Sequence, residues 1–154
     1  MAFLYKQATI KDLDLLTETR IEVLRAANQL SEDADMTEVR EQSYRYYKKA
    51  LCDGTHIAYL IFEKEEFAGA GGVSFYQVMP TYHNPTGKKA YIMNMYTKPK
   101  FRRQGIAYKT LDLLVKAAKS RGITAISLEA TDMGRPLYEK YGFVNMEHEM
   151  ELPE

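Results

Sequence analysis

The sequence predicts an α/β domain, and three observations support this fold class. Residues 90–97 are apolar on both faces of an extended chain, as in a strand that is covered on two sides. From Ala107 to Ala118, apolar residues recur at helical intervals and give one face of a long helix that ends near Gly122. Strand and helix patterns follow one another along the whole chain without a repeat or a linker, so we expect a single domain over residues 1–154.

The remaining segments predict the other elements in chain order. Thr9 and Asp12 have the spacing of a capping box at the start of the first helix, and Asp53-Gly54 closes the second. Apolar residues alternate on either side of the charged turn 64–66, which indicates two adjacent strands. The expected elements are a strand over 3–7, a helix over 9–28, an acidic loop over 31–35, a helix from Asp35 or Thr37 to 51, strands over 56–64 and 67–78, a loop over 79–89, the central strand and the long helix, a strand over 123–129, a short helix over 136–141 and a last strand over 144–152.

The start of the long helix lacks the residues that usually cap one. A helix normally begins after Ser, Thr, Asp or Asn and has acidic residues in its first turn, because these groups satisfy free N–H groups and suit the positive end of the helix dipole. Here the approach is basic from Lys98 to Arg103, Gly105 follows, and no acidic residue occurs before Asp112. We infer that the capping anion comes from outside the chain, with a phosphate group as the best candidate.

Two motifs near this helix resemble those of one enzyme family. The chain contains neither the three-glycine dinucleotide fingerprint nor the P-loop sequence. It does contain R-x-x-G-x-A from Arg102 to Ala107, which resembles the pyrophosphate loop Q/R-x-x-G-x-G/A of the GNAT superfamily of acyl-CoA-dependent N-acetyltransferases. The segment from Leu137 to Phe143 resembles the L-Y-x-x-x-G-F segment of the same superfamily. Either motif alone is a weak signal, but here both occur in the order of that family.

The resemblance implies a fold and an activity. The fold would be a mixed, mostly antiparallel central sheet of about six to seven strands, flanked by about four helices. The activity would be transfer of an acetyl group from acetyl-CoA to a primary amine by direct attack in a ternary complex. Tyr138 matches the tyrosine that the family uses as general acid, and a phenol is protonated at neutral pH, so it can donate to the departing CoA thiolate. The alternative is a non-catalytic acyl-CoA-binding or sensing module on the same fold, against which the presence of Tyr138 argues.

The same resemblance assigns the acyl-CoA contacts, mainly to backbone groups. The end of the central strand would hold the pantetheine arm at a bulge, where one N–H group would hold the carbonyl oxygen. The glycine loop and the first helical turn would hold the pyrophosphate on their N–H groups. The expected binding residues are Met95, Tyr96, Thr97, Arg102, Arg103, Gln104, Gly105, Ile106, Ala107 and Tyr108. Thr131 and Gly134 replace the Asn and Ala that many relatives carry, which puts the usual side-chain contact to pantetheine in doubt.

The acceptor side of the site is less clearly marked. Glu129, at the end of its strand, is the leading candidate for the general base, and Asn94 could orient a water molecule. Arg20 lies inside the apolar arc of the first helix, between Leu16 and Val23. A buried, unpaired guanidinium is costly, so Arg20 has to reach outward to solvent, pair with a carboxylate or enter a cavity. In the last case it would bind an anionic group of the acceptor or order Glu129.

Composition narrows the functional class. The 154 residues are 45% apolar and 27% charged and carry no net charge, which argues against a nucleic-acid or membrane partner. The three histidines are far apart and Cys52 is alone, so we expect no metal. The lone cysteine and the lack of a signal-peptide pattern favour the cytoplasm. The expected partner is an amine-bearing small molecule or peptide, and the sequence leaves a homodimer open.

Overall fold

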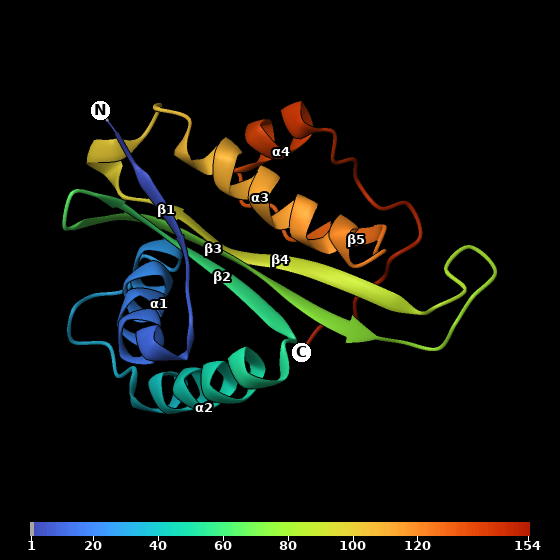
Figure 1. Ribbon diagram of the computed structural model, residues 1–154, viewed down its shortest axis with the longest axis horizontal. Coiled ribbons are helices and arrows are strands. Elements are labelled where there is room, and N and C mark those ends of the chain that lie inside the picture. The colour runs from blue at the N-terminus through green and yellow to red at the C-terminus, as the bar shows by residue number, and fades with distance from the viewer. Residues whose placement is uncertain (1) are drawn as a thin grey trace.

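The computed structural model describes residues 2–154 as a sheet between two pairs of helices. The strands are β1 (Leu4–Gln7), β2 (His56–Glu63), β3 (Glu66–Gln77), β4 (Lys88–Thr97) and β5 (Ala125–Leu128). The helices are α1 (Leu13–Ala27), α2 (Thr37–Asp53), α3 (Ile106–Ser120) and α4 (Arg135–Tyr141), with short 3-10 turns at Ile10–Asp12 and Pro99–Phe101. Figure 1 shows α1 and α2 on one side of the twisted sheet and α3 and α4 on the other.

The strands lie in the order in which they occur along the chain. The sheet has the order β1-β2-β3-β4-β5, with antiparallel pairing from β1 to β4 and parallel pairing between β4 and β5. The expected mixed, mostly antiparallel sheet and its four helices are therefore confirmed. The expected number of six to seven strands is wrong, because residues 2–154 form a sheet of five.

The last strand that the sequence predicts, over residues 144–152, does not form. The segment has no regular secondary structure and bends at residues 147–148, and Val144, Met150 and Leu152 are almost fully exposed. Alternation of apolar and polar residues gives a segment the pattern of a strand, but a strand also needs a partner edge on which to pack. The neighbouring edge belongs to β5, which is only four residues long. Glutamates at every second position of the segment add like charges along one side of it.

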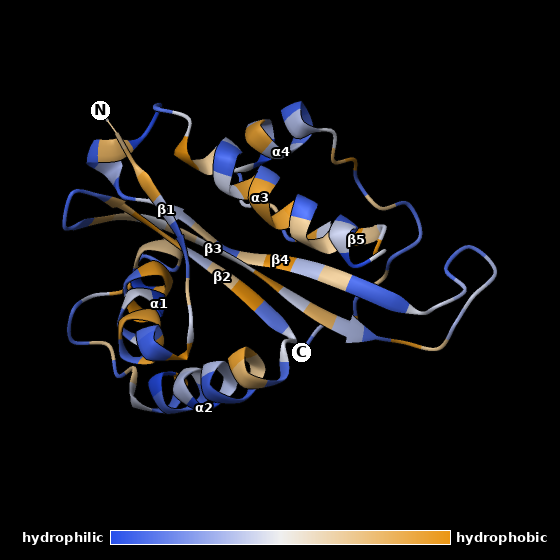
Figure 2. Cartoon of the chain, viewed as in Figure 1, coloured by the Kyte–Doolittle hydropathy of each residue, from blue (hydrophilic) through white to orange (hydrophobic). Residues whose placement is uncertain are grey.

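The long helix forms as the apolar periodicity predicts. It begins at Ile106, one residue earlier than expected, and ends at Ser120. Figure 2 shows hydrophobic and hydrophilic bands alternating along α3, beside a hydrophobic middle of β4. The buried side chains of the helix are Ile106, Thr110, Leu111, Leu114, Val115 and Ala118. This face packs on β3 and β4 and forms the largest part of the core.

The second helix resolves the two starts that the sequence left open. It begins at Thr37, and Asp35 accepts hydrogen bonds from the Thr37 backbone N–H at 3.0 Å and from its hydroxyl at 2.7 Å. At the other end, Gly54 adopts a φ of 77° and closes the helix, as the Asp53-Gly54 pair predicts.

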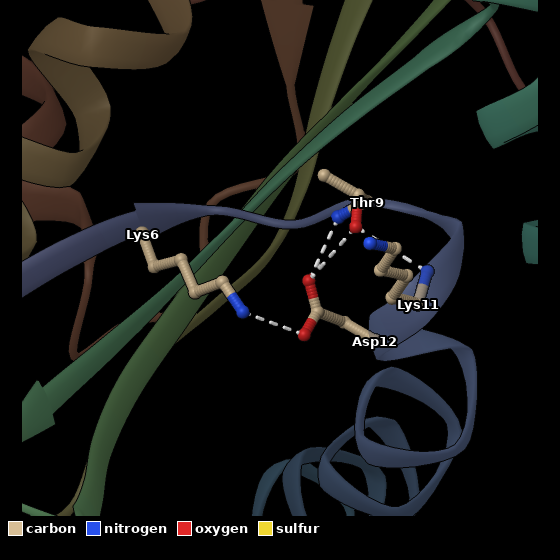
Figure 3. Close-up of polar contacts among 4 residues, drawn as sticks. All are labelled: Lys6, Thr9, Lys11 and Asp12. Atoms are coloured by element: carbon tan, nitrogen blue, oxygen red, sulfur yellow. Dashed lines mark hydrogen bonds and ion pairs between the residues drawn. The ribbon is translucent and has the colours of Figure 1, made fainter.

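A carboxylate ties the start of α1 to β1 (Figure 3). Asp12 accepts a hydrogen bond from the Thr9 backbone N–H at 2.8 Å, and the Lys11 N–H donates to the Thr9 hydroxyl at 3.3 Å. Lys6 of β1 donates to the second oxygen of Asp12 at 2.7 Å. The expected capping box is thus present, on the 3-10 turn that leads into α1. Burial acts to raise the pKa of Asp12, but the hydrogen bonds from Lys6 and Thr9 outweigh it and lower the pKa.

Because the pKa of Asp12 is lowered by folding, its carboxylate stabilises the fold above about pH 4, the value of an unfolded Asp, and the effect is lost as the pH falls through the folded pKa. We expect Asp12→Asn to lower the free energy of unfolding by about 1 kcal/mol at pH 7. The difference from the wild type should shrink as the pH falls below the unfolded value. Urea unfolding across this pH range measures both effects. The matched control is Asp33→Asn in the exposed loop, and an equal loss in both variants would contradict the prediction.

Candidate functional site

The end of β4 carries a β-bulge, which the family resemblance implied. In the register with β3, Asn94 and Met95 together lie opposite the single residue Gly71. Asn94 has a φ of 61°, a left-handed conformation that Asn tolerates better than most residues. The extra residue places Met93 and Asn94 on the α1 and α2 side of the sheet, while Met95 packs with the core on the α3 side.

Glycines of β3 allow other elements to approach the sheet closely at this bulge. A Cβ atom at Gly71 would lie 2.6 Å from the Cγ2 atom of Thr110 on α3 and 2.9 Å from the sulfur of Met95. A Cβ atom at Gly72 would lie 2.7 Å from Nε2 of His56. Sequence reasoning missed these residues, although several glycines within one apolar strand are a signal for a bulge or a close backbone approach.

β4 and β5 separate beyond the first half of β4. Their pairing joins 89–92 to 125–128. From Met93 to Thr97, β4 keeps β3 on one side, and no strand within residues 2–154 pairs with its other edge. The expected pantetheine-binding residues, 95–97, all lie in this stretch. Their unpaired edge presents N–H and C=O groups that an extended ligand with amide groups can pair with.

α3 begins at a bare glycine, as the sequence predicts. Gly105 is the N-cap residue with a φ of 84°, no side chain caps the helix, and its first turn contains no acidic residue. A Cβ atom at Gly105 would meet no heavy atom within 4 Å, so there is open space on the Cβ side of the residue that precedes the first helical turn. Arg103 also has a positive φ, of 63°, and it belongs to the same exposed turn. The expected cradle residues 102–108 therefore lie around one helix end.

Two of the four basic residues before α3 lack a compensating charge. Lys98 and Lys100 each lie near a glutamate of the chain, at 3.9 and 2.8 Å. Within residues 2–154, Arg102 and Arg103 form no ion pair. Nε of Arg102 donates to the backbone carbonyl of Thr97 at 3.2 Å, which ties this turn to the end of β4. The guanidinium groups leave a local positive potential at the helix end, where the dipole also favours an anion.

α4 presents two tyrosines in different environments. The Tyr141 hydroxyl donates to Asp112 at 2.8 Å, and burial together with this carboxylate raises the pKa of Tyr141 to about 12. Tyr138 is buried against Phe143, and burial raises its pKa as well. Within residues 2–154, no hydrogen bond of the Tyr138 side chain is seen, and Tyr138 lines a pocket. Gly134 makes room for this ring, since a Cβ atom there would lie 2.9 Å from it.

The structure does not bring Glu129 together with the other predicted site residues. Tyr138 lines a pocket of about 570 Å³ between β5, α4 and the unpaired chain end, but Glu129 does not line it. Glu129 is exposed and lies near Tyr91, whose pKa burial and this carboxylate both raise. Arg20 donates to Asn94 and not to Glu129, so the expected alternative in which Arg20 orders Glu129 is not seen.

Arg20 reaches a cavity, which was one of its expected outcomes. It is half-buried, and its Nη1 atom donates to the side-chain oxygen of Asn94 at 2.9 Å. Both residues line a pocket of about 280 Å³ between α1, α2 and the sheet. The lining residues are Arg20, Gln42, Ser43, Tyr46, Tyr47, His56, Ser74, Met93 and Asn94. The pocket therefore adjoins the bulge of β4 from the face opposite α3.

A hydrogen-bonded group on the wall of this pocket was missed by sequence reasoning. His56 is buried, and its Nδ1 atom lies 3.1 Å from both the Tyr46 hydroxyl and the Ser74 hydroxyl, which are 2.6 Å apart. Nε2 of His56 has no hydrogen-bond partner. Burial and, to a smaller extent, the Arg20 charge lower the pKa of His56 to about 4, so the imidazole is neutral at pH 7. His56 and Ser74 lie on different strands, and nothing in their spacing links them to Tyr46.

A model of the acetyltransferase (GNAT) family matches residues 23–143 of the chain, which is most of its length. The chain belongs to the GNAT family. The match covers the bulged strand, the uncapped helix and α4, where the two sequence motifs lie. No curated protein matches the sequence.

Solved structures share this GNAT fold over nearly the whole chain. A crystal structure of a predicted acetyltransferase with acetyl-CoA from Clostridium acetobutylicum is 35% identical, with a TM-score of 0.88 over 99% of this chain and 96% of that one. A GCN5-related N-acetyltransferase from Ralstonia eutropha is 25% identical, with a TM-score of 0.83 over 99% and 98%. Glucosamine-6-phosphate N-acetyltransferase from Arabidopsis thaliana, at 18% identity, a TM-score of 0.71 and 99% coverage of both chains, shares the fold.

In the described part of the chain, no three His, Cys, Asp or Glu side chains are grouped as metal ligands would be. None of the helices in residues 2–154 is both long and apolar enough to cross a bilayer. Cys52 is a free, exposed thiol.

The buried imidazole predicts a pH dependence of stability. Between its unfolded pKa of about 6.5 and its folded pKa of about 4, His56 binds a proton in the unfolded chain but not in the folded protein. Lowering the pH from 7 to 4 should therefore lower the free energy of unfolding, and His56→Gln should reduce this slope. Urea unfolding at several pH values measures it. His83→Gln, in an exposed loop, is the control, and an unchanged slope in His56→Gln would show that His56 does not contribute.

Proposed function

We propose that this GNAT protein transfers the acetyl group of acetyl-CoA to a primary amine. The start of α3 carries the proposal: an uncapped helix, an open space at Gly105 and two unpaired arginines fit a pyrophosphate. The similar Clostridium acetobutylicum protein, whose crystal structure contains acetyl-CoA, supports the choice of the acyl donor. The amine-binding pocket is the one that contains Arg20 and Asn94, since it adjoins the same stretch of β4.

In this proposal, acetyl-CoA binds on the α3 side of β4 and the acceptor amine on the side of α1 and α2. The N–H groups at the start of α3 hold the pyrophosphate, and the free edge of residues 95–97 pairs with the amide groups of the pantetheine arm. Acetyl-CoA brings an activated thioester, so no covalent enzyme intermediate is needed. An N–H group at the bulge is the proposed donor to the carbonyl oxygen as negative charge develops on it. The acceptor amine approaches from the Arg20 side.

Tyr138 is the proposed general acid for the departing thiolate. Burial raises the pKa of Tyr138, which keeps the phenol protonated at neutral pH, and no other residue of the described chain is seen to form a hydrogen bond with its hydroxyl. Glu129 as general base, acting directly or through water, stays a prediction, and its exposed position leaves it outside both pockets. The orientation of a water molecule by Asn94 also stays a prediction.

Thiol release tests the activity directly. The protein is incubated with acetyl-CoA and a panel of primary amines that includes small molecules and peptide amines, and free CoA thiol is measured. We expect release that depends on one class of amine and an acetylated product detected by mass spectrometry. Binding of acetyl-CoA without thiol release for any amine would contradict the proposal and support the acyl-CoA-sensing alternative.

The helix-end cradle predicts a selective loss of CoA binding. Gly105→Glu places a carboxylate beside the free N–H groups of α3, where it competes with the pyrophosphate. Calorimetric titration should show no CoA binding by this variant. Gly122→Glu is a matched control, because Gly122 also has a positive φ with open space around it but lies at the other end of α3. Wild-type CoA affinity in a folded Gly105→Glu protein would exclude the cradle.

The acid assignment predicts a loss of turnover rather than of binding. Tyr138→Phe should lower kcat by roughly 10²–10⁴-fold, the usual contribution of a positioned proton donor, with little change in CoA affinity. The matched control is Tyr141→Phe, on the same short helix as Tyr138; it removes the hydroxyl that donates to Asp112 of α3, so it should cost stability but leave kcat near the wild-type value. Steady-state kinetics with the accepted amine separates the two. Equal turnover in wild type and Tyr138→Phe, with chemistry rate-limiting, would remove Tyr138 from the mechanism.

A further inference from the structure

The Arg20 guanidinium is a half-buried positive charge without a carboxylate partner. Within residues 2–154 it forms no ion pair, and its one side-chain hydrogen bond is to the neutral amide oxygen of Asn94. The nearby glutamates of α1 are engaged elsewhere: Glu18 pairs with Arg40, and Glu22 lies 3.9 Å from Lys98. A cation that is partly removed from water without a counter-charge is costly, so its retention in a pocket wall calls for an anion that arrives from outside.

The rest of the pocket adds hydrogen-bond donors and no negative charge. None of its nine lining residues is Asp or Glu. His56 is neutral because of its lowered pKa and adds no second positive charge, and burial raises the pKa of Tyr47 to about 12, so its phenol carries no negative charge that could compensate Arg20 at pH 7. The pocket, at about 280 Å³, therefore combines one guanidinium with neutral polar groups, a combination that suits an oxyanion and repels a second cation.

The hydrogen bonds among His56, Tyr46 and Ser74 indicate which of these groups donate and which accept. Nε2 of His56 faces the backbone of Gly72 and has no partner, which favours a proton on Nδ1. Nδ1–H then donates to the Tyr46 hydroxyl or the Ser74 hydroxyl, and these two share a hydrogen bond of 2.6 Å. The Ser74 hydroxyl lies 3.9 Å from the sulfur of Met93, a weak acceptor, so it can turn towards a stronger acceptor in the pocket.

We propose that the acceptor is an amine that carries a carboxylate or a phosphate group, and that Arg20 binds this anion with help from the Ser74 hydroxyl, while the Tyr46 hydroxyl donates to Ser74. The inference rests on the proposed function for the transfer step but not for the anion site itself. Because Arg20 is bonded to Asn94 on the bulge, an anion bound there keeps the ligand next to the strand that holds the thioester. Neutral and polycationic amines lack the group that compensates Arg20.

Anion binding can be measured without any acetyl transfer. The protein is first saturated with CoA, so that the start of α3 is filled, and is then titrated with inorganic phosphate, with propionate and with neutral propionamide. The side-chain amide signals of Asn94 report on the site by NMR. We expect saturable shifts with at least one anion and none with propionamide, and no saturable shift in Arg20→Gln. Absence of anion-dependent shifts in the wild type would overturn the proposal.

Matched amines then test the substrate class and separate the two anions. β-Alanine is compared with β-alaninamide, and phosphoethanolamine with ethanolamine, by thiol release from acetyl-CoA. For the preferred anionic amine, Arg20→Gln should lower kcat/KM by roughly 10- to 100-fold, the usual range for hydrogen bonds to a charged group, mainly through KM. For the matched neutral amine, kcat/KM should change little in Arg20→Gln. Each amine is compared with itself in two proteins, so differences in amine basicity cancel.

Other outcomes are equally informative. If Arg20→Gln lowers kcat/KM for every amine alike and raises the KM of acetyl-CoA, then Arg20 serves only to hold Asn94 at the bulge, and the anion proposal is wrong. If the neutral amines are acetylated as fast as the matched anionic amines, the anion proposal is also wrong, but the proposed function stands. Anion binding with no thiol release for any amine would contradict the proposed function alone. Arg25→Gln, on α1 but bonded to the Ser31 carbonyl, is the control and should leave all these constants unchanged.

Discussion

The site depends on the close approach between α3 and β3 at Gly71. A side chain at this position would overlap Thr110 of the helix and Met95 of the neighbouring strand, so glycine lets the three elements meet without displacing either side chain. This contact fixes where α3 lies on the sheet, and it therefore fixes where the uncapped end at Gly105 projects. The same residue is the one that faces the bulge of β4. The position of α3 and the bulge of β4 therefore both depend on Gly71, which contacts the side chains of Thr110 and Met95 on the buried face of the sheet.

The bulge divides β4 between two kinds of recognition. On the α3 side, the unpaired edge of residues 95–97 and the helix end offer backbone groups, which in the proposed function recognise the acyl donor by shape and phosphate charge. On the α1 side, Asn94 and Arg20 offer side chains, whose identity can change without altering the fold. In the proposed function, the backbone groups of the GNAT fold therefore bind the acyl donor, and the choice of acceptor depends on individual side chains.

The sequence predicted the parts of the structure that arise from local patterns. The periodicity of α3, the capping box at Thr9 and the bare Gly105 are visible in a few consecutive residues, and each was confirmed. The prediction of a strand over 144–152 was wrong, because alternation of apolar and polar residues shows that a segment favours an extended conformation but not whether a partner strand is available to it. The hydrogen-bonded group around His56 could not be foreseen, since its members come from three elements and meet only through the sheet register.

The hydrogen bonds of Asp12 limit where residues can be inserted into or deleted from the start of α1. Asp12 anchors the first turn before α1 to β1, and Arg20 follows eight residues later on the same rigid helix. An α-helix rotates by about 100° per residue, so one inserted or deleted residue between them would turn the guanidinium away from Asn94 while leaving the anchor intact. Insertions and deletions are therefore excluded from this stretch by geometry. The loop between α1 and α2, by contrast, can lengthen or shorten without moving either end of the connection between Arg20 and the sheet.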